Sequence, residues 1–271
     1  MKTRIITAIA LLLVAVPIVI FSDTVVFPIV IALINIVGVY EMLRCMKMRD
    51  KYFLSVPLYI LAAGIPILLK YFRVYIYLHL PKLIIALLLF ALYLLTVVVF
   101  SHGKLSIGEV FASVMLSLYV IGACSCILYI RDLKYGAYFW IFIFIGAWVT
   151  DIFAYFTGML FGKHKLIPDV SPKKTVEGSI GGIVFCMIAF VIYGFILTRH
   201  FEPNISLVLC AVTGLISSVV SQLGDLSMSV IKRNYGVKDF GKIFPGHGGV
   251  LDRFDSIMAV AVVLAIATQF M

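Results

Sequence analysis

The sequence predicts an all-α, polytopic integral membrane protein with about nine transmembrane helices. Of its 271 residues, 63% are apolar and 13% are charged, whereas soluble domains have about 45–50% apolar and about 25% charged residues. The apolar residues gather into runs long enough to cross a bilayer, which takes about 20 residues. So little charge cannot cover a soluble surface. The composition therefore excludes a soluble enzyme, a disordered chain, a disulfide-stapled secreted domain and a nucleic-acid binder.

Nine apolar runs follow one another along the chain, separated by short segments that carry Lys, Arg, Pro and Gly. They lie near residues 5–21, 24–41, 53–69, 83–100, 109–130, 136–160, 180–198, 205–224 and 256–271. The first run follows a basic N-terminus, as a signal peptide would, but it lacks a clear small-residue cleavage site and eight further runs follow it. We therefore expect a retained helix there.

The distribution of Lys and Arg predicts the orientation of these helices. With the N-terminus inside, 16 of the 22 Lys and Arg residues fall in segments on the inner side, and basic residues are enriched on the cytoplasmic side of membrane proteins. This predicts an N-in, C-out topology with the long polar segments 161–179 and 225–255 on the cytoplasmic face. Residues 1–105, about four helices, carry little chemistry, so we expect the catalytic region within residues 106–271.

A polar stripe runs along the eighth apolar run and continues beyond it. Its members recur at steps of three or four residues, which places them on one helical face. They are Ser218, Ser221, Gln222, Asp225, Ser229 and Lys232. A carboxylate at or just inside a membrane interface is costly and usually marks function. Asp225 is therefore a candidate functional residue, and the alternative is a solvated interfacial aspartate.

Residues 232–255 combine three features of a site for phosphate and metal. The basic residues are dense enough to bind several phosphate oxygens, and three glycines within residues 246–249 let backbone N–H groups approach an anion. Asp252 and Asp255 open the last helix on one face, and Mg²⁺ uses one or two carboxylates together with substrate oxygens. A helix N-cap or a basic loop at the lipid surface would explain single features, but their coincidence favours a site.

A second cluster lies in and after the sixth apolar run. Asp151, Tyr155, Gly158 and Gly162 fall on one helical face, although a G-x-x-x-G spacing more often marks a close helix contact. The loop that follows has lysines and hydroxyl groups suited to phosphate, or is a plain basic cytoplasmic loop. Its candidate binding residues are Ser171, Lys173, Lys174 and Thr175.

Other catalytic patterns are missing from the sequence. Residues 158–164 fall one residue short of a P-loop, and the sequence has no H-E-x-x-H, G-x-S-x-G or G-x-G-x-x-G. A serine hydrolase, a zinc protease and a Rossmann dehydrogenase therefore lose support. His247 has no partner at metal-ligand spacing, so we interpret it as a phosphate or structural hydrogen-bond donor.

Residues 229–255 resemble the signature of the phosphatidate cytidylyltransferases, also called CDP-diacylglycerol synthases. That signature runs Ser-x-apolar-Lys-Arg, then Lys-Asp-x-small after four residues, then apolar-Pro-x-His-Gly-Gly-apolar-x-Asp-Arg-apolar-Asp. The matching positions are Ser229, Ile231, Lys232, Arg233, Lys238, Asp239, Gly241, Phe244, Pro245, His247, Gly248, Gly249, Val250, Asp252, Arg253, Phe254 and Asp255. No position departs from the signature. Residues 151–162, 171–178 and 222–225 are also similar to the C-terminal half of the family.

The resemblance implies an enzyme of phospholipid biosynthesis that converts CTP and phosphatidate into CDP-diacylglycerol and pyrophosphate. It implies Mg²⁺ as cofactor, as one or two divalent ions or with a monovalent second ion. The expected metal ligands are Asp225 and Asp252, with Asp255 and Asp151 as further ligands. The expected phosphate-binding residues are Lys232, Arg233, Lys238, Lys242 and Arg253, assisted by Ser171, Lys173, Lys174, Thr175, Gly248 and Gly249; Asp239 and His247 complete the expected catalytic set.

The resemblance also implies a multi-pass homodimer in the cell membrane, with its active site on the cytoplasmic side and no nucleic-acid partner. Two other classes stay open. A CTP-dependent membrane lipid kinase similar to dolichol kinase would release CDP in place of pyrophosphate. A transporter of an anionic solute would use the polar stripe as its path and act only across sealed vesicles. CDP-alcohol phosphotransferases are disfavoured, because their D-G-x-x-A-R pattern is missing.

Overall fold

A computed structural model shows a chain that is mostly helical and divides into two compact units. The structure describes residue 13 and residues 16–72, 80–201 and 205–270. The first unit is Met1–Leu128 with Phe240–Leu251, and the second is Tyr129–Asp239 with Asp252–Met271. Most of the predicted first span, residues 5–21, lies outside the described residues.

Within the described residues, six helices are long and apolar enough to cross a membrane. They are Val26–Cys45, Tyr52–Tyr71, Ile107–Arg131, Gly136–Phe161, Val176–His200 and Leu207–Asn234. The apolar helix Ile84–Phe100 is shorter than this limit, and the last helix, α12 (Leu251–Ala267), has 17 residues. The protein is thus a multi-pass helical membrane protein. The number of nine spans and the N-in, C-out orientation stay predictions.

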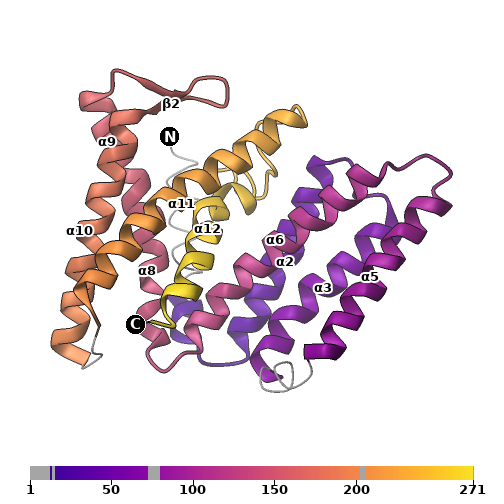
Figure 1. The fold of residues 1–271 in the computed structure, drawn as a ribbon, viewed down its shortest axis with the longest axis horizontal. Helices are drawn as coiled ribbons and strands as arrows, with labels where there is room; N and C mark the ends of the chain where they lie inside the picture. Colours follow the sequence, from indigo (N-terminus) through magenta and orange to yellow (C-terminus); the bar gives the residue numbers. More distant parts are fainter. Residues whose placement is uncertain (1–12, 14–15, 73–79, 202–204, 271) are drawn as a thin grey trace. The chain divides into compact units, whose positions relative to one another are not determined.

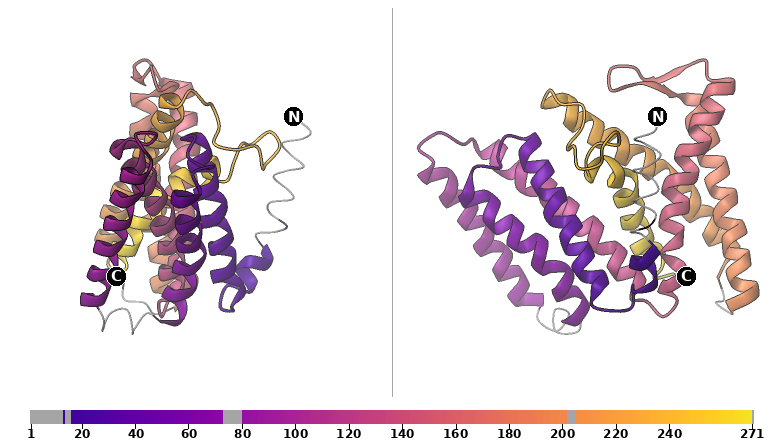
Figure 2. Two further views of the ribbon diagram at one scale, coloured as in Figure 1. Left: turned by 90° about the vertical axis from the view of Figure 1, so that its right-hand side faces the viewer. Right: turned by 180° about the vertical axis from the view of Figure 1, so that it is seen from behind.

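The first unit contains α2 (Val26–Cys45), α3 (Tyr52–Tyr71), α5 (Leu80–Phe100) and α6 (Ile107–Arg131), shown in Figures 1 and 2. Helix α3 packs against α2 on one side and contacts α5 on the other. The Asn35 side-chain amide donates to the Ala62 carbonyl oxygen at 3.5 Å and joins α2 to α3. Gly38 brings α2 close to α6, because a Cβ there would lie 2.9 Å from a methyl carbon of Val120. Small residues at such crossings let membrane helices approach closely.

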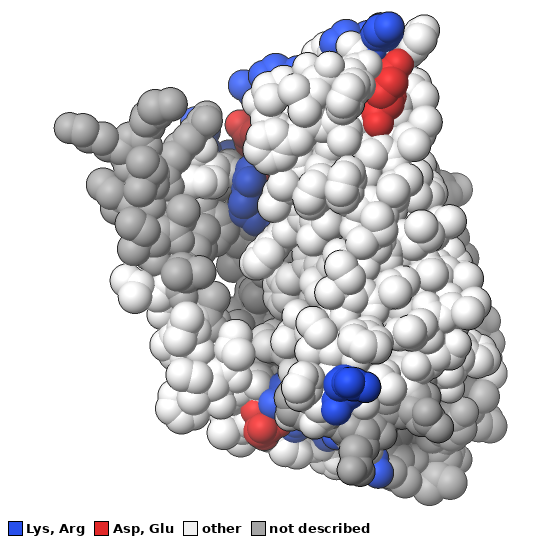
Figure 3. All heavy atoms as spheres, turned by 90° about the vertical axis from the view of Figure 1, so that its left-hand side faces the viewer, with Lys and Arg blue, Asp and Glu red and all other residues white. Residues whose placement is uncertain are grey.

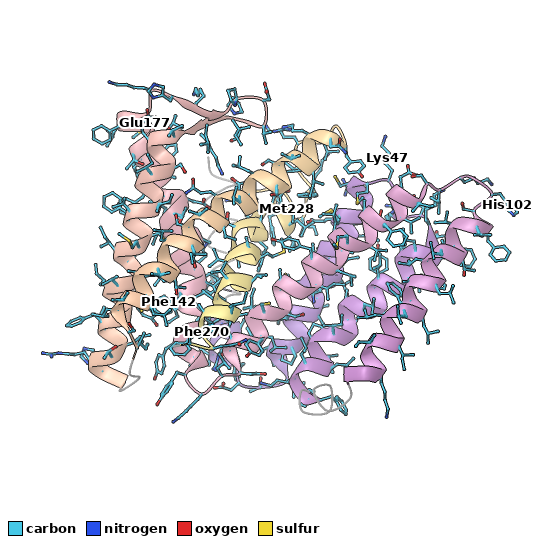
Figure 4. All side chains as sticks on the ribbon, in the orientation of Figure 1. Lys47, His102, Phe142, Glu177, Met228 and Phe270 are labelled. Carbon is cyan, nitrogen blue, oxygen red and sulfur yellow. The ribbon has the colours of Figure 1, made fainter. Side chains whose placement is uncertain are left out.

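Two turns lie at the same end of this unit. Lys47 follows α2 and His102 follows α5, and Figure 4 labels both. A groove of about 610 Å³ is lined at this end by Asp50, Lys51, His102 and Lys104, and further along by apolar side chains of α3 and α5.

In the second unit, α10 (Val176–Phe201) packs against both α9 (Thr150–Phe161) and α11 (Leu207–Asn234) (Figure 1). The path that ends in α9 is not one regular helix. It is built from α7 (Gly136–Phe139), α8 (Ile141–Phe144), a π-helical turn η1 (Ile145–Val149) and α9. Near its beginning, the Phe142 ring packs against Phe190 and Tyr193 of α10, with ring centroids 4.8 Å apart in each pair.

The predicted polar segments are shorter and more ordered than the sequence suggested. Residues 225–234, predicted as loop, continue α11 to Asn234, because the end of an apolar run marks the membrane boundary and not the end of a helix. Between α9 and α10, strands β1 (Lys165–Ile167) and β2 (Ser171–Thr175) form an antiparallel hairpin, so the fold is mostly but not entirely helical. Helix α10 begins at Val176, four residues before the predicted run.

The outer face of α9 and α10 suits a lipid environment. In Figure 3, the Lys, Arg, Asp and Glu side chains of this face lie toward its two ends, and the broad surface between them carries none. The exposed apolar side chains of α9 and α10 include Phe156, Ile188 and Phe195. An uncharged band between polar ends is expected of helices that face hydrocarbon.

Replacing Gly182 by alanine should destabilise the second unit. A Cβ at this position would lie 2.9 Å from the carbonyl oxygen of Thr150 and 3.2 Å from the Ala154 Cβ, so α9 and α10 must separate. Overpacking of this kind costs about 1–3 kcal/mol. Thermal denaturation in detergent measures the change. The matched control is Gly64→Ala in α3, where a Cβ would meet nothing within 4 Å, and an equal loss of stability in both variants would contradict the close packing.

Candidate active site

A pocket of about 490 Å³ in the second unit gathers most of the polar side chains that the sequence singled out. Helix α9 contributes Asp151 and Tyr155, and α11 contributes Gln222 and Asp225. The hairpin contributes Ser171, Lys173, Lys174 and Thr175, and the first turns of α12 contribute Asp252, Arg253, Asp255 and Ser256. Four aspartates and three basic side chains therefore surround one cavity.

Hydrogen bonds between helices hold the walls of the pocket together. The Thr150 hydroxyl donates to the Ser218 hydroxyl at 2.9 Å, and both residues are completely buried. The Gln222 side-chain amide donates to the Ser179 carbonyl oxygen at 3.3 Å. These bonds join α11 to α9 and to α10. Buried polar groups need such partners, because an unpaired one carries a desolvation penalty.

The π-helical turn η1 lies directly before Thr150 and Asp151. A π turn contains an extra residue, and such turns are frequent at functional sites. After it, α9 is regular, so Asp151, Tyr155 and Gly158 fall on one face as predicted and line the pocket together. Gly162, the fourth member of that set, instead makes room for Thr175, because a Cβ at Gly162 would lie 2.8 Å from the Thr175 methyl group.

Glu177 anchors the hairpin to the beginning of α10. Its carboxylate accepts the backbone N–H groups of Lys163 at 3.1 Å and His164 at 3.2 Å, and the Nδ1 atom of His164 lies 2.6 Å from it. Figure 4 shows Glu177 at the hairpin end of this unit and Phe142, which belongs to α8, toward the opposite end. The carboxylate also lies in the first turn of α10, where the helix dipole favours negative charge. The anchor joins the residues just before β1 to the beginning of α10, which follows β2 directly.

Two ion pairs neutralise aspartates of the pocket. Lys174 of β2 lies 2.5 Å from Asp225 of α11. Lys232 of α11 lies 2.7 Å from Asp252 of α12, and this second pair is deeply buried, with side-chain exposures of 10% and 3%. Asp255 lies just before the predicted last span, and burial, followed by the negative charge of Asp225, raises the pKa of its carboxyl group. Burial and the neighbouring carboxylate therefore both disfavour the charged form of Asp255.

The donor set fits a hard divalent cation that arrives together with a polyphosphate. Among the described residues, no group of three or more His, Cys, Asp and Glu side chains is arranged to hold a metal ion. Mg²⁺ does not need such a cage, because it binds through one or two carboxylates plus substrate phosphates and water. Asp225 and Asp252 are suitable carboxylates in one pocket, and each now has a lysine as its counter-ion.

The comparison with known proteins agrees with this chemistry. The model of the Cytidylyltransferase family matches residues 2–271. The chain belongs to this family. It is therefore a nucleotidyltransferase, and the family resemblance predicted from residues 229–255 is confirmed.

Two relatives in the cytidylyltransferase family match nearly the whole chain, and a third matches about three fifths of it. The phosphatidate cytidylyltransferase of Staphylococcus saprophyticus is 36% identical over 266 residues, which is 98% of each chain. That of Staphylococcus aureus strain COL is 35% identical over 268 residues, again 98% of each chain. The phosphatidate cytidylyltransferase of Bacillus subtilis strain 168 is 42% identical over 171 residues, or 62% of each chain.

The structure does not bring every predicted site residue of this family member to the pocket. Lys232 lies behind it, paired with Asp252. Arg233 is exposed and donates to the Val237 carbonyl oxygen at 3.2 Å near the end of α11. Lys238 and Asp239 are exposed on the loop after α11 and do not line the cavity. The roles predicted for these residues stay predictions.

The remaining predicted residues, Lys242, His247, Gly248 and Gly249, belong to Phe240–Leu251, which packs within the first unit. Here Phe244 and Gly248 pair through their backbones, with N···O distances of 2.9 and 3.1 Å. Gly248 has a φ of +89°, a conformation in which a side chain would be strained. The segment is therefore a tight, ordered loop.

Sequence reasoning missed two carboxylates that shape the signature region and the hairpin. Glu177 follows Thr175 closely at the beginning of an apolar run, which is a position typical of a helix-capping acid. Glu41 is 1% exposed and lies in the first unit. Its signal was a single acidic residue near the end of the otherwise apolar run that begins at residue 24. Neither residue could be assigned a partner from spacing alone.

Replacing Lys232 by methionine should destabilise the protein strongly. The substitution leaves the buried Asp252 carboxylate without its lysine, and removing one partner of a buried ion pair costs about 3–5 kcal/mol. The matched control is Arg49→Met, because Arg49 pairs with Asp50 at 2.8 Å with both side chains exposed. Solvent screens such a pair, so little change is expected. Thermal denaturation in detergent compares the two variants, and equal effects would show that the Lys232 pair is not buried as described.

Proposed function

We propose that this protein transfers CMP from CTP to phosphatidate, forming CDP-diacylglycerol and pyrophosphate. Its relatives over 98% of the chain are phosphatidate cytidylyltransferases. The observation that carries the proposal is the pocket in which Asp225 and Asp252 stand beside Lys174 and Arg253. Carboxylates suit a cation that accompanies a nucleotide, and the basic side chains suit the phosphates themselves.

The reaction is a single displacement at the α-phosphorus of CTP. An oxygen of the phosphatidate phosphate forms a new bond to this phosphorus, while the bond to the bridging oxygen of the β-phosphate breaks and pyrophosphate leaves with the electron pair. No bond to the protein is needed. Catalysis then depends on holding the two phosphates in line and on stabilising charge in the transition state.

The basic residues have separable tasks in this scheme. Lys173 and Lys174 come from the hairpin and would bind the triphosphate. Arg253 is exposed at the beginning of α12, and its planar guanidinium group suits two oxygens of one phosphate. The hydroxyl groups of Ser171 and Thr175 would donate hydrogen bonds to remaining oxygens.

Mg²⁺ is the cofactor that this pocket would hold, with Asp225 and Asp252 as ligands and Asp151 and Asp255 beside them. A bound Mg²⁺ would neutralise charge on the phosphate oxygens of both substrates. The carboxylates would hold this ion in the pocket, and the basic side chains would bind the nucleotide phosphates. One or two ions, or a monovalent second ion, remain parts of the same proposal.

The proposed topology has nine spans, N-in and C-out, in the cell membrane. It is supported by the 16 of 22 Lys and Arg residues that this orientation puts inside. The pocket then opens to the cytoplasm, where CTP is available, and phosphatidate enters from the bilayer. We also propose a homodimer on the strength of the family resemblance, without a nucleic-acid partner.

The activity is tested with the purified protein in detergent, phosphatidate, CTP and Mg²⁺. Formation of the liponucleotide and of pyrophosphate in equal amounts is expected. Release of CDP with phosphorylation of a lipid alcohol would instead identify a lipid kinase. Solute movement across sealed vesicles without either product would identify a transporter. Each of the last two results contradicts the proposed function.

Asp225→Asn and Asp252→Asn should each lower the turnover number by about 100-fold or more, the range found when a group that stabilises transition-state charge is removed. Both variants should also lose the thermal stabilisation that Mg²⁺ with CTP gives the unaltered protein, which is about 2.7 kcal/mol at 100 times the dissociation constant. Activity assays and thermal denaturation measure the two effects.

Asp169→Asn is the matched control, since Asp169 is an exposed aspartate in the hairpin turn and should leave both properties unchanged. Asp252→Asn also removes the partner of Lys232, so its folding is checked in the same denaturation experiment. Near-normal turnover in both pocket variants would contradict the metal assignment.

A further inference from the structure

A buried carboxylate in the first unit has no place in the chemistry described so far. Glu41 lies near the end of α2, within a helix of mostly apolar residues, and is 1% exposed. Burying a charged group is expensive unless hydrogen bonds compensate it. Glu41 is thus present at a cost that an apolar residue would avoid, and its partners indicate what it does.

Both carboxylate oxygens of Glu41 accept backbone N–H groups from a segment more than 200 residues away. The Val250 N–H donates to Oε1 at 3.1 Å, and the Leu251 N–H donates to Oε2 at 2.9 Å. Leu251 is the first residue of α12. The first N–H groups of a helix have no partner within it and attract negative charge. Glu41 therefore caps α12, the role that a neighbouring Ser, Thr or Asp usually has.

Two glycines fit the loop around this carboxylate. A Cβ at Gly241 or at Gly249 would collide with the carboxylate oxygens of Glu41. Neither glycine has a positive φ, so the backbone conformation does not explain why glycine occurs there. The close approach of the carboxylate does. The tight loop between α11 and α12 is thus built around a side chain of α2.

We infer that Glu41 is a positioning residue for the reaction, because it fixes the beginning of the helix that presents Asp252 and Asp255. Asp252 follows Leu251 directly in the first turn of α12, and Asp255 lies one turn later. Without its cap, a first helical turn frays, and the direction of these two carboxylates is no longer fixed. This inference rests on the proposed function for its kinetic readout but not for its structural one.

The test compares Glu41→Gln with Glu41→Asp. Glutamine has the same shape, but its –NH₂ group would face one of the two N–H donors. Aspartate keeps both acceptor oxygens on a side chain one methylene shorter. The control is Glu109→Gln in the same unit, because Glu109 accepts the Ser106 N–H at 2.9 Å and caps its own helix, α6. All three variants retain the remaining residues of the pocket and the loop.

Hydrogen–deuterium exchange of the amides of residues 249–256 gives the structural readout. Exchange should accelerate in Glu41→Gln by about 10- to 100-fold, as expected when a hydrogen bond to a charged group is lost. The kinetic readout is the turnover number and the Mg²⁺ concentration for half-maximal velocity. Turnover should fall by about 10- to 100-fold, and the Mg²⁺ requirement should rise, because Asp252 and Asp255 are displaced. Glu41→Asp should lie between Glu41→Gln and the unaltered protein in amide exchange and in turnover. Glu109→Gln should resemble the unaltered protein in both.

Several results would overturn the inference. Unchanged exchange in Glu41→Gln would show that the cap does not hold α12. Faster exchange with normal turnover and a normal Mg²⁺ requirement would show that the cap is structural only. If Glu41→Gln does not fold, the same two criteria apply to Glu41→Asp. If the unaltered protein forms no liponucleotide, the proposed function fails, whereas the exchange experiment still decides whether Glu41 caps α12.

Discussion

Crowding of four carboxylates around one pocket is the constraint on which the second unit depends. Like charges at short range raise one another's free energy, and burial adds to this cost. Lysines from two different elements compensate this charge. Lys174 of the hairpin pairs with Asp225, and Lys232 of α11 pairs with Asp252. The hairpin, α11 and α12 each supply charged side chains to these pairs, so the compensation of charge depends on all three elements.

Glu41 meets the same constraint by different means. Its charge is compensated by backbone N–H groups of residues 250 and 251, which stay in place as long as the helix begins there. A lysine counter-ion, by contrast, can be displaced by another cation. This difference suits the two tasks. The pocket aspartates need partners that can be displaced if a metal and phosphates are to enter, whereas the beginning of the helix that carries Asp252 needs a partner that stays in place.

Local patterns in the sequence predicted much of the helical framework and the composition of the pocket. The three- and four-residue steps placed Asp151 with Tyr155 and Asp225 with Gln222, and each pair lines the cavity. The polar stripe continued to Lys232 with helical spacing, which already indicated that α11 extends past its apolar run. The predicted loop nevertheless began at residue 225. Pairing of β1 with β2 gave no comparable signal, because two strands of three and five residues are defined by their contact and not by their periodicity.

Contacts between distant parts of the chain could not be predicted in this way. Glu41 caps residues that follow it by 209 and 210 positions in the sequence. No spacing rule relates residues so far apart. Gly241 and Gly249 were both part of the signature, and of the two only Gly249 was predicted to approach an anion, as one of the glycines within residues 246–249. The anion they approach in the structure is a side chain of the protein itself.

The π-helical turn at Ile145–Val149 separates two packing registers along one path through the membrane. Before it, Phe142 meets the aromatic residues of α10; after it, Asp151 faces the polar cavity. The extra residue is absorbed within the turn, because a π-helical residue advances around the axis by less than the roughly 100° of an α-helical one. If the same five residues formed regular α-helix, the two halves would rotate against each other, and the aromatic contact and Asp151 could not both keep their present faces.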